Sequence, residues 1–225
     1  MNIPTPPLSS ELAKRIRLVR RDMGDLLFHF TRGAEPVWRE VQGHRCNTAE
    51  TASHVLTKIL MAGLRGSSGW TYGINTVCFT EAPISEFNAV FSLNSIASEA
   101  HLRPRYEPYG VAVSKAWLFS KGGRPVIYDH PQEQASYPPD LLFRFCPYDP
   151  ASGVDYTWER EWRIRAETLE LDPKQTIVIV PSAEEAFEFV YDFASEEADV
   201  DASGSFTGSY HRPKWLAVSL DMFGT

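Results

Sequence analysis

Several sequence patterns that mark common functional sites are missing from this chain of 225 residues. Its three cysteines, Cys46, Cys78 and Cys146, are widely spaced, and no CxxC pair occurs. This spacing favours neither a zinc site nor a disulfide framework, and it fits a reducing compartment best. The phosphate-binding fingerprints GxGxxG and GxxxxGK and the nucleophile motif GxSxG are also absent. The histidines show no metal-ligand spacing, so we expect no metal site.

Long hydrophobic runs and a surplus of positive charge are lacking as well. No apolar run reaches the roughly 18–20 residues that a membrane-spanning helix needs, and the polar, proline-rich start is unlike a signal peptide. The net charge of −7 argues against a generally basic nucleic-acid-binding surface. A local basic stretch, 14–21, is either a solvated helix face or a contact for an acidic partner. We expect a cytoplasmic protein that does not enter membranes.

The pattern of apolar residues predicts a single α+β domain over residues 1–225, because strands and helices do not alternate regularly. The predicted strands are 26–30, 76–80, 110–114, 124–128, 156–165, 176–180 and 215–220. The predicted helices are 9–21, 49–62, 84–100 and 182–193. Residues 1–9 are expected to form a loose N-terminal tail, 129–153 a long ordered loop, and 195–209 a mobile acidic loop.

The first candidate site lies in the predicted strand 26–30. His29 and Thr31 are two residues apart, so their side chains share one face of the strand, and Phe28 and Phe30 take the other. A polar strand face is unfavourable unless it lines a cleft or finds partners. His29 is therefore either a satisfied core histidine or a residue of a binding cleft.

The second candidate lies in the predicted strand 156–165. Glu159, Glu161 and Arg163 share one face, whereas the other face is mainly apolar, with Trp158 and Trp162. The polar face is either a surface ladder of ion pairs or a carboxylate held in a site by a neighbouring arginine.

Two further residues are candidates for ligand contacts. Arg65 follows a predicted helix end, and it is either simply exposed to solvent or positions a phosphate through its planar guanidinium. Tyr72 lies in a glycine-rich loop, where its ring either stacks on a flat ligand or packs the loop. Cys78 lies in an apolar strand and is interpreted as a core residue rather than a nucleophile.

Family resemblances add to these patterns. Residues 27–32 resemble the first-strand motif of ADP-ribosyltransferases, His-x-Thr/Ser, as found in poly(ADP-ribose) polymerases and DarT-type toxins. Residues 73–80 loosely resemble the second motif of these enzymes, and Glu161 matches the glutamate of the third. Five blocks resemble the AbiGi-type abortive-infection family in its order: 29–31, 77–83, 109–117, 124–128 and 159–163.

These resemblances imply a fold of split antiparallel sheets that form a cleft, with flanking helices. They imply a phage-defence protein that cleaves NAD and transfers ADP-ribose to a protein or nucleic-acid acceptor. Glu161 would stabilise the cation formed on the ribose, or Glu159 in its place. The expected contacts to NAD are His29 donating to the adenosine ribose, Thr31 at the nicotinamide, Arg65 at the pyrophosphate and Tyr72. The alternative is a non-catalytic antitoxin that binds a toxin partner.

Overall fold

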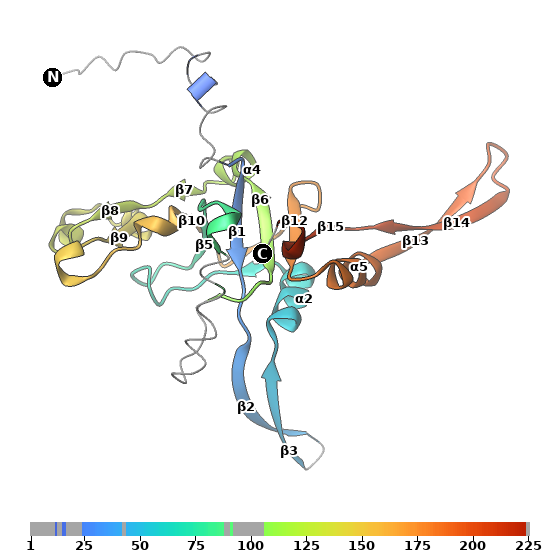
Figure 1. The fold of residues 1–225 in the computed structure, drawn as a ribbon, viewed down its shortest axis with the longest axis horizontal. Helices are drawn as coiled ribbons and strands as arrows, with labels where there is room; N and C mark the ends of the chain where they lie inside the picture. The colour runs from blue at the N-terminus through green and yellow to red at the C-terminus, as the bar shows by residue number, and fades with distance from the viewer. Residues whose placement is uncertain are drawn as a thin grey trace.

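The protein has a mixed α/β fold built on one mostly antiparallel sheet, in line with the predicted α+β class (Figure 1). The computed structural model describes residues 12, 15, 16, 24–41, 44–87, 91 and 106–223, and only the backbone of 34–41, 44–49, 210, 211 and 223. The sheet has seven strands in the order β15-β12-β6-β1-β5-β10-β7. In chain order these are β1 (Leu26–Phe30), β5 (Thr76–Thr80), β6 (Gly110–Ser114), β7 (Arg124–Pro125), β10 (Glu161–Arg165), β12 (Thr176–Val180) and β15 (Leu216–Ser219).

Helices and short two-stranded sheets surround this sheet. The helices are α2 (Ala52–Ala62), α4 (Lys115–Ser120) and α5 (Ala183–Asp192). The 3-10 turns are η1 (Pro131–Ser136), η2 (Leu142–Arg144), η3 (Pro150–Ser152), η4 (Thr157–Glu159) and η5 (Leu220–Phe223). The strand pairs are β2 (Ala34–Val41) with β3 (His44–Glu50), β4 (Leu64–Arg65) with β11 (Thr168–Leu169), β8 (Ile127–Asp129) with β9 (Phe145–Pro147), and β13 (Ala194–Val200) with β14 (Phe206–Pro213). In the described part of the chain, no helix has the length and apolar character needed to cross a bilayer.

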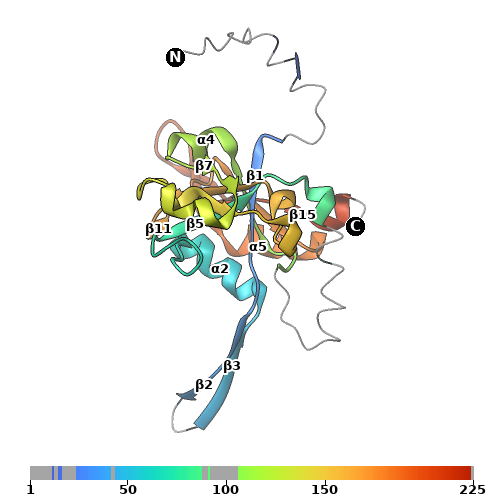
Figure 2. The ribbon, with the colours of Figure 1, turned by 90° about the vertical axis from the view of Figure 1, so that its left-hand side faces the viewer.

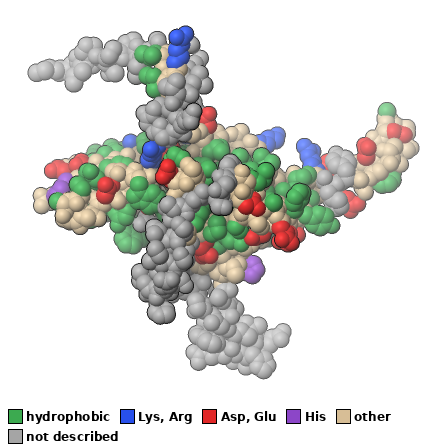
Figure 3. Space-filling view, viewed as in Figure 1, with side chains coloured by type: hydrophobic (Ala, Val, Ile, Leu, Met, Phe, Trp, Pro, Cys, Tyr) green, Lys and Arg blue, Asp and Glu red, His purple; other side chains and the backbone are tan. Residues whose placement is uncertain are grey.

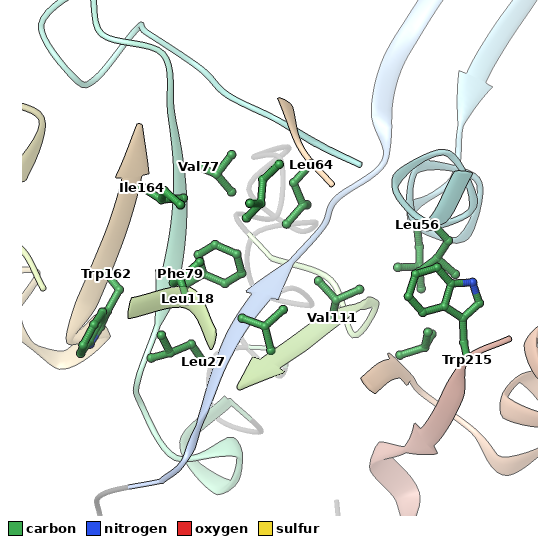
Figure 4. Close-up of a cluster of buried hydrophobic side chains, with 14 of the residues drawn as sticks. Leu27, Leu56, Leu64, Val77, Phe79, Val111, Leu118, Trp162, Ile164 and Trp215 are labelled. Carbon is green, nitrogen blue, oxygen red and sulfur yellow. The ribbon is translucent and has the colours of Figure 1, made fainter. Parts of the chain in front are cut away.

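Alternation along the strands gives the sheet two apolar faces. On one face Leu27, Phe79 and Trp162, from three adjacent strands, join the main core cluster, which α2 and α4 complete with Leu56 and Leu118 (Figure 4). The other face carries a smaller cluster that contains Phe30, Ala82, Phe87, Ala112, Ile179 and Leu220. The predicted division of β1 into two faces is confirmed, because Leu27 and Phe30 belong to different clusters.

The large sheet consists of two halves that are joined at one point. On one side β1 pairs with β6 over five residue pairs, and on the other β10 pairs with β5 over five. Between the halves, the only paired residues of β1 and β5 are Phe28 and Thr80. The two halves are β15-β12-β6-β1 and β5-β10-β7. They separate beyond the Phe28–Thr80 pair toward the end of β1, where His29 is the next residue.

Two hairpins project from the body of the molecule. β2 and β3 form one arm, visible in both ribbon views (Figures 1 and 2), and β13 and β14 form the other (Figure 1). The predicted mobile acidic loop 195–209 is wrong, because most of these residues pair as strands around a turn at 201–205. The acidic and Gly/Ser-rich composition suggested a loop, but the residues of a two-stranded ribbon exposed on both faces need no apolar alternation.

The bounds of several other strands and helices differ from those predicted from the sequence. The predicted strand 156–165 is broken, since η4 is followed by Arg160 at a φ of 45°, and only then does β10 begin. Helix α2 begins at Ala52 because the Thr51 side chain accepts a hydrogen bond from the His54 backbone and caps it. The tail 1–9 and most of the helices predicted at 9–21 and 84–100 lie outside the described residues; residues 12, 15, 16, 84–87 and 91 are helical.

Candidate functional site

The centre of the candidate site is a buried ion pair between Glu161 and Arg163 on β10. Arg163 Nε donates to Glu161 Oε1 and Arg163 Nη2 donates to Glu161 Oε2, each at 2.8 Å. Burial opposes the charge of the guanidinium, but the hydrogen bonds and the charge of Glu161 outweigh it and raise the pKa of Arg163. Glu161 and Arg163 do share a face, as predicted, but this face is covered rather than open to solvent.

The register of β10 explains this arrangement. Glu161 lies opposite Thr80 and Arg163 opposite Cys78, while Trp162 between them points into the main core. Arg163 Nη1 donates to the carbonyls of Phe143 and Phe145, at 3.1 and 2.8 Å. The pair thus fastens the segment that contains η2 and β9 to the sheet.

Glu159 occupies a different environment from Glu161. It ends the η4 turn and is buried, with its backbone carbonyl accepting a hydrogen bond from Thr80 Oγ1 at 2.5 Å. Arg160 adopts a left-handed conformation between the two glutamates, so the alternation of an extended strand does not hold here. The prediction that Glu159 and Glu161 share one strand face is therefore wrong.

A cavity adjoins the turn that carries Glu159. Its volume is about 370 Å³, and it is lined by Pro83, Glu86, Thr157, Trp158 and Arg160. Trp158 is partly exposed there, and its ring lies 6.3 Å from that of Phe87. His29, Arg65 and Glu161 are not among the described residues that line this cavity. The cavity therefore does not bring the predicted site residues together.

His29 lies at the point where the two halves of the sheet separate. Its ring nitrogen Nδ1 is 2.8 Å from the carbonyl oxygen of Cys78, and its ring meets the Phe79 ring edge-on at 5.8 Å. Burial lowers the pKa of His29, although the hydrogen bond to Cys78 opposes this shift. A carbonyl only accepts, so Nδ1 carries the proton and Nε2 of the neutral ring is an acceptor.

His29 and Glu161 start from opposite faces of the sheet. Phe28 pairs with Thr80 and Thr80 pairs with Glu161, so these three side chains share one face. His29, the next residue after Phe28, points to the face of the main core, where its strand partner Val111 also lies. The two predicted site residues are thus on nearby strands but not on one surface.

Thr31 makes structural contacts. Its hydroxyl lies 3.3 Å from the Ala52 carbonyl and 3.1 Å from the Tyr109 carbonyl, and its backbone N–H donates to Tyr109 as well. The side chain is buried and joins the end of β1 to the start of α2. These contacts use the hydroxyl proton that the expected nicotinamide contact would need.

Arg65 and Tyr72 are placed differently relative to Glu161. Arg65 is exposed on β4, which reaches β5 through the bridge of Ser67 to Thr76, at the opposite end of β5 from Thr80. Thr76 and Thr80, at the two ends of β5, are about 13 Å apart along the strand. Tyr72 packs its ring edge against Phe145 at 5.9 Å. Phe145 also accepts a hydrogen bond from Arg163, so Tyr72 lies near the ion pair. Burial raises the pKa of Tyr72, and the charge of Arg163 opposes this shift.

One contact of Glu161 was not singled out from the sequence. The Tyr128 hydroxyl accepts a hydrogen bond from the Glu161 backbone N–H at 3.1 Å and donates to the Tyr156 carbonyl at 3.2 Å. Burial raises the pKa of Tyr128 to about 12, so it stays a neutral donor. The block 124–128, which ends at this tyrosine, was the available signal.

The chain was compared with protein-family models, with curated proteins and with solved structures, and no match was found in any of the three. We therefore infer function from the sequence motifs and the geometry.

Proposed function

We propose that this chain is an ADP-ribosyltransferase-like protein that cleaves NAD and transfers ADP-ribose to an acceptor. One observation carries the proposal. The three motif segments, which are up to about 130 residues apart in sequence, supply three adjacent strands, β1, β5 and β10, beside the division of the sheet. Split antiparallel sheets are what the motif resemblance implies, and the single pair Phe28–Thr80 between the halves supports it.

Cleavage of NAD requires a carboxylate held in a fixed orientation. Cleavage of the nicotinamide bond leaves an oxocarbenium-like ribose, as in glycoside hydrolysis, and an oriented anion stabilises that charge. Arg163 fixes both oxygens of Glu161, yet a carboxylate oxygen has two lone pairs, and each keeps one for a ribose hydroxyl. Glu161 therefore suits this role better than Glu159, which lies in a turn outside β10.

The histidine has a revised role in this proposal. Since Nδ1–H is used by Cys78, the Nε2 atom of His29 would accept from a ribose hydroxyl rather than donate to one. Because His29 and Glu161 start from opposite faces of the sheet, a dinucleotide that contacts both would have to pass between the two halves of the sheet. Tyr72, near the ion pair, would flank the same region, and Arg65 would meet only a ligand that extends along β5.

The proposed biological setting is phage defence, on the strength of the AbiGi-type blocks alone. The acceptor would be a protein or a nucleic acid, and a toxin or antitoxin partner is part of the same proposal. The setting predicts that expression of the chain changes the yield of phage from infected cells.

A measurement of NAD binding tests the first requirement of the proposal. A ligand that binds only the folded state raises the melting temperature with its concentration. We expect NAD to stabilise the wild type, His29→Ala to weaken NAD binding about tenfold, which is about 1.4 kcal/mol, and Thr31→Val to bind normally. Absence of a shift in the wild type, checked by isothermal titration calorimetry, would contradict the proposal.

A second candidate is a non-catalytic antitoxin or interaction module. It is favoured by the Glu161–Arg163 pair, because this buried pair has a structural role: Arg163 also bonds the segment that contains η2 and β9. The two projecting hairpins suit contacts with another macromolecule (Figure 1). This function predicts a specific complex with a partner and no thermal shift from NAD.

A further inference from the structure

Helix α5 and the β13–β14 arm carry a concentration of negative charge. Residues 181–213 contain eight acidic side chains and one basic side chain, Arg212, although the whole chain has a net charge of only −7. The remainder of the chain is therefore close to neutral. Figure 3 shows acidic and hydrophobic side chains together over α5 and along the arm.

The outward side of α5 is an exposed stripe of acids and aromatics. Phe189 points inward to the main core, whereas Phe187 and Tyr191 are 78% and 70% exposed. These two aromatics are one turn apart and share the stripe with exposed carboxylates, namely Glu184, Glu188 and Asp192. Large exposed aromatics rimmed by charge are typical of interaction sites.

The arm continues this surface. Val200 and Phe206 face each other near its tip and are 54% and 68% exposed, and the exposed Glu196 and Asp199 lie on the same strand as Val200. A two-stranded ribbon alone is marginally stable in water, so a partner that packs on it would stabilise it.

Several of these carboxylates form no ion pair within the part of the chain that the structure describes. Glu184, Glu188, Asp192, Glu196 and Asp199 form no ion pair with any residue in the described ranges, whereas Glu197 pairs with Arg212. Asp192 lies at the end of α5, where the helix dipole favours a cation, and the last turn contains no basic residue. The surface is thus electrostatically suited to a basic partner.

We propose that the acidic surface, Glu184–Asp192 of α5 with the β13–β14 arm, binds the basic N-terminal segment 12–21 of a second copy of this chain. That segment carries five cations, Lys14, Arg15, Arg17, Arg20 and Arg21. Its apolar residues Leu12, Ile16 and Val19 follow helical spacing, and Leu12 and Ile16 are 47% and 42% exposed. Charges and apolar groups therefore match those of the acidic surface, and reciprocal exchange gives a closed dimer.

Charge reversal on each side separately and together tests this dimer. Sedimentation velocity of the full chain at about 50 mM salt, where charges are weakly screened, should show a dimer. Either Arg17→Glu/Arg20→Glu or Glu188→Lys/Asp192→Lys should weaken dimerisation at least about tenfold. A mixture of the two variants should associate again, since one interface then has the wild-type charges and the other has the charges exchanged. Far-UV circular dichroism verifies that each variant is folded.

A matched control reverses two exposed acids elsewhere, Asp140→Lys/Glu170→Lys, and should leave the dimer unchanged. About 1 M salt should weaken the wild-type dimer, because the screening length falls to about 3 Å. A wild type that stays monomeric to about 100 μM, or a dimer that neither variant weakens, would overturn the proposal. Failure of the mixed variants to associate would do the same. None of these outcomes depends on NAD.

Discussion

Glu161 and Arg163, two residues apart on β10, form a two-point ion pair whose arginine also reaches the carbonyls of Phe143 and Phe145. Two of these four hydrogen bonds, those to Phe143 and Phe145, connect the central sheet to the segment that covers this pair. A carboxylate held in this way has one fixed orientation. The same contact therefore serves both the stability of the fold and any chemistry at Glu161.

Replacement of Arg163 by methionine should reduce the free energy of unfolding by about 3–5 kcal/mol, because it leaves a buried carboxylate without its partner. Urea unfolding followed by circular dichroism measures this. Arg165→Met, on the exposed part of the same strand, should cost less than about 1 kcal/mol. Equal losses in the two variants would show that the ion pair has no special role.

Thr31→Val should lower the free energy of unfolding by about 1–2 kcal/mol, since the Ala52 and Tyr109 carbonyls lose a hydroxyl donor. NAD affinity, measured by calorimetry, should stay within about twofold of the wild type. A large loss of NAD affinity with unchanged stability would instead restore the nicotinamide contact expected from the motif.

Stability should fall in mild acid through His29. Burial lowers its pKa in the folded state below the unfolded value of about 6.5. The unfolded state then binds more protons, so this contribution is complete above pH 6.5 and is lost as the pH falls below it. His29→Gln should flatten the decline in unfolding free energy between about pH 7 and pH 5. An unchanged slope in that variant would mean that His29 does not titrate differently on folding.

Cys78 should be unreactive in the folded protein. Burial raises the pKa of its thiol, and the nearby negative charge of Glu161 raises it further. In a Cys46→Ser background, iodoacetamide at pH 8 should label Cys78 and the buried Cys146 only after unfolding. Rapid labelling of Cys78, located by peptide mass spectrometry, would show an exposed thiolate.

The strands that carry the motifs could be predicted from local sequence. Strands β1, β5, β6 and β12 have the predicted bounds, because each is a short apolar run of the kind that fills both faces of a covered sheet. Helix α5 begins one residue after the start of the predicted helix 182–193, because the Ser182 side chain caps it.

Features that depend on tertiary contacts or on single backbone angles could not be predicted. The break at Arg160, which separates Glu159 from Glu161, follows from one left-handed residue in an otherwise strand-like sequence. The opposite facing of His29 and Glu161 depends on the register Phe28–Thr80–Glu161, which joins three strands distant in sequence. The β13–β14 arm escaped prediction because a ribbon exposed on both faces needs no apolar alternation.

Nicotinamide release from NAD by the purified protein tests the central claim most directly, with lysate of phage-infected cells added as a source of acceptor. Glu161→Gln should reduce the rate about 10²-fold or more, because it removes the charge that stabilises the ribosyl cation. Glu159→Gln should retain the rate within a few-fold, at a temperature where both variants are folded. Absence of release by the wild type, or a fully active Glu161→Gln variant, would contradict the assignment of NAD cleavage to this site.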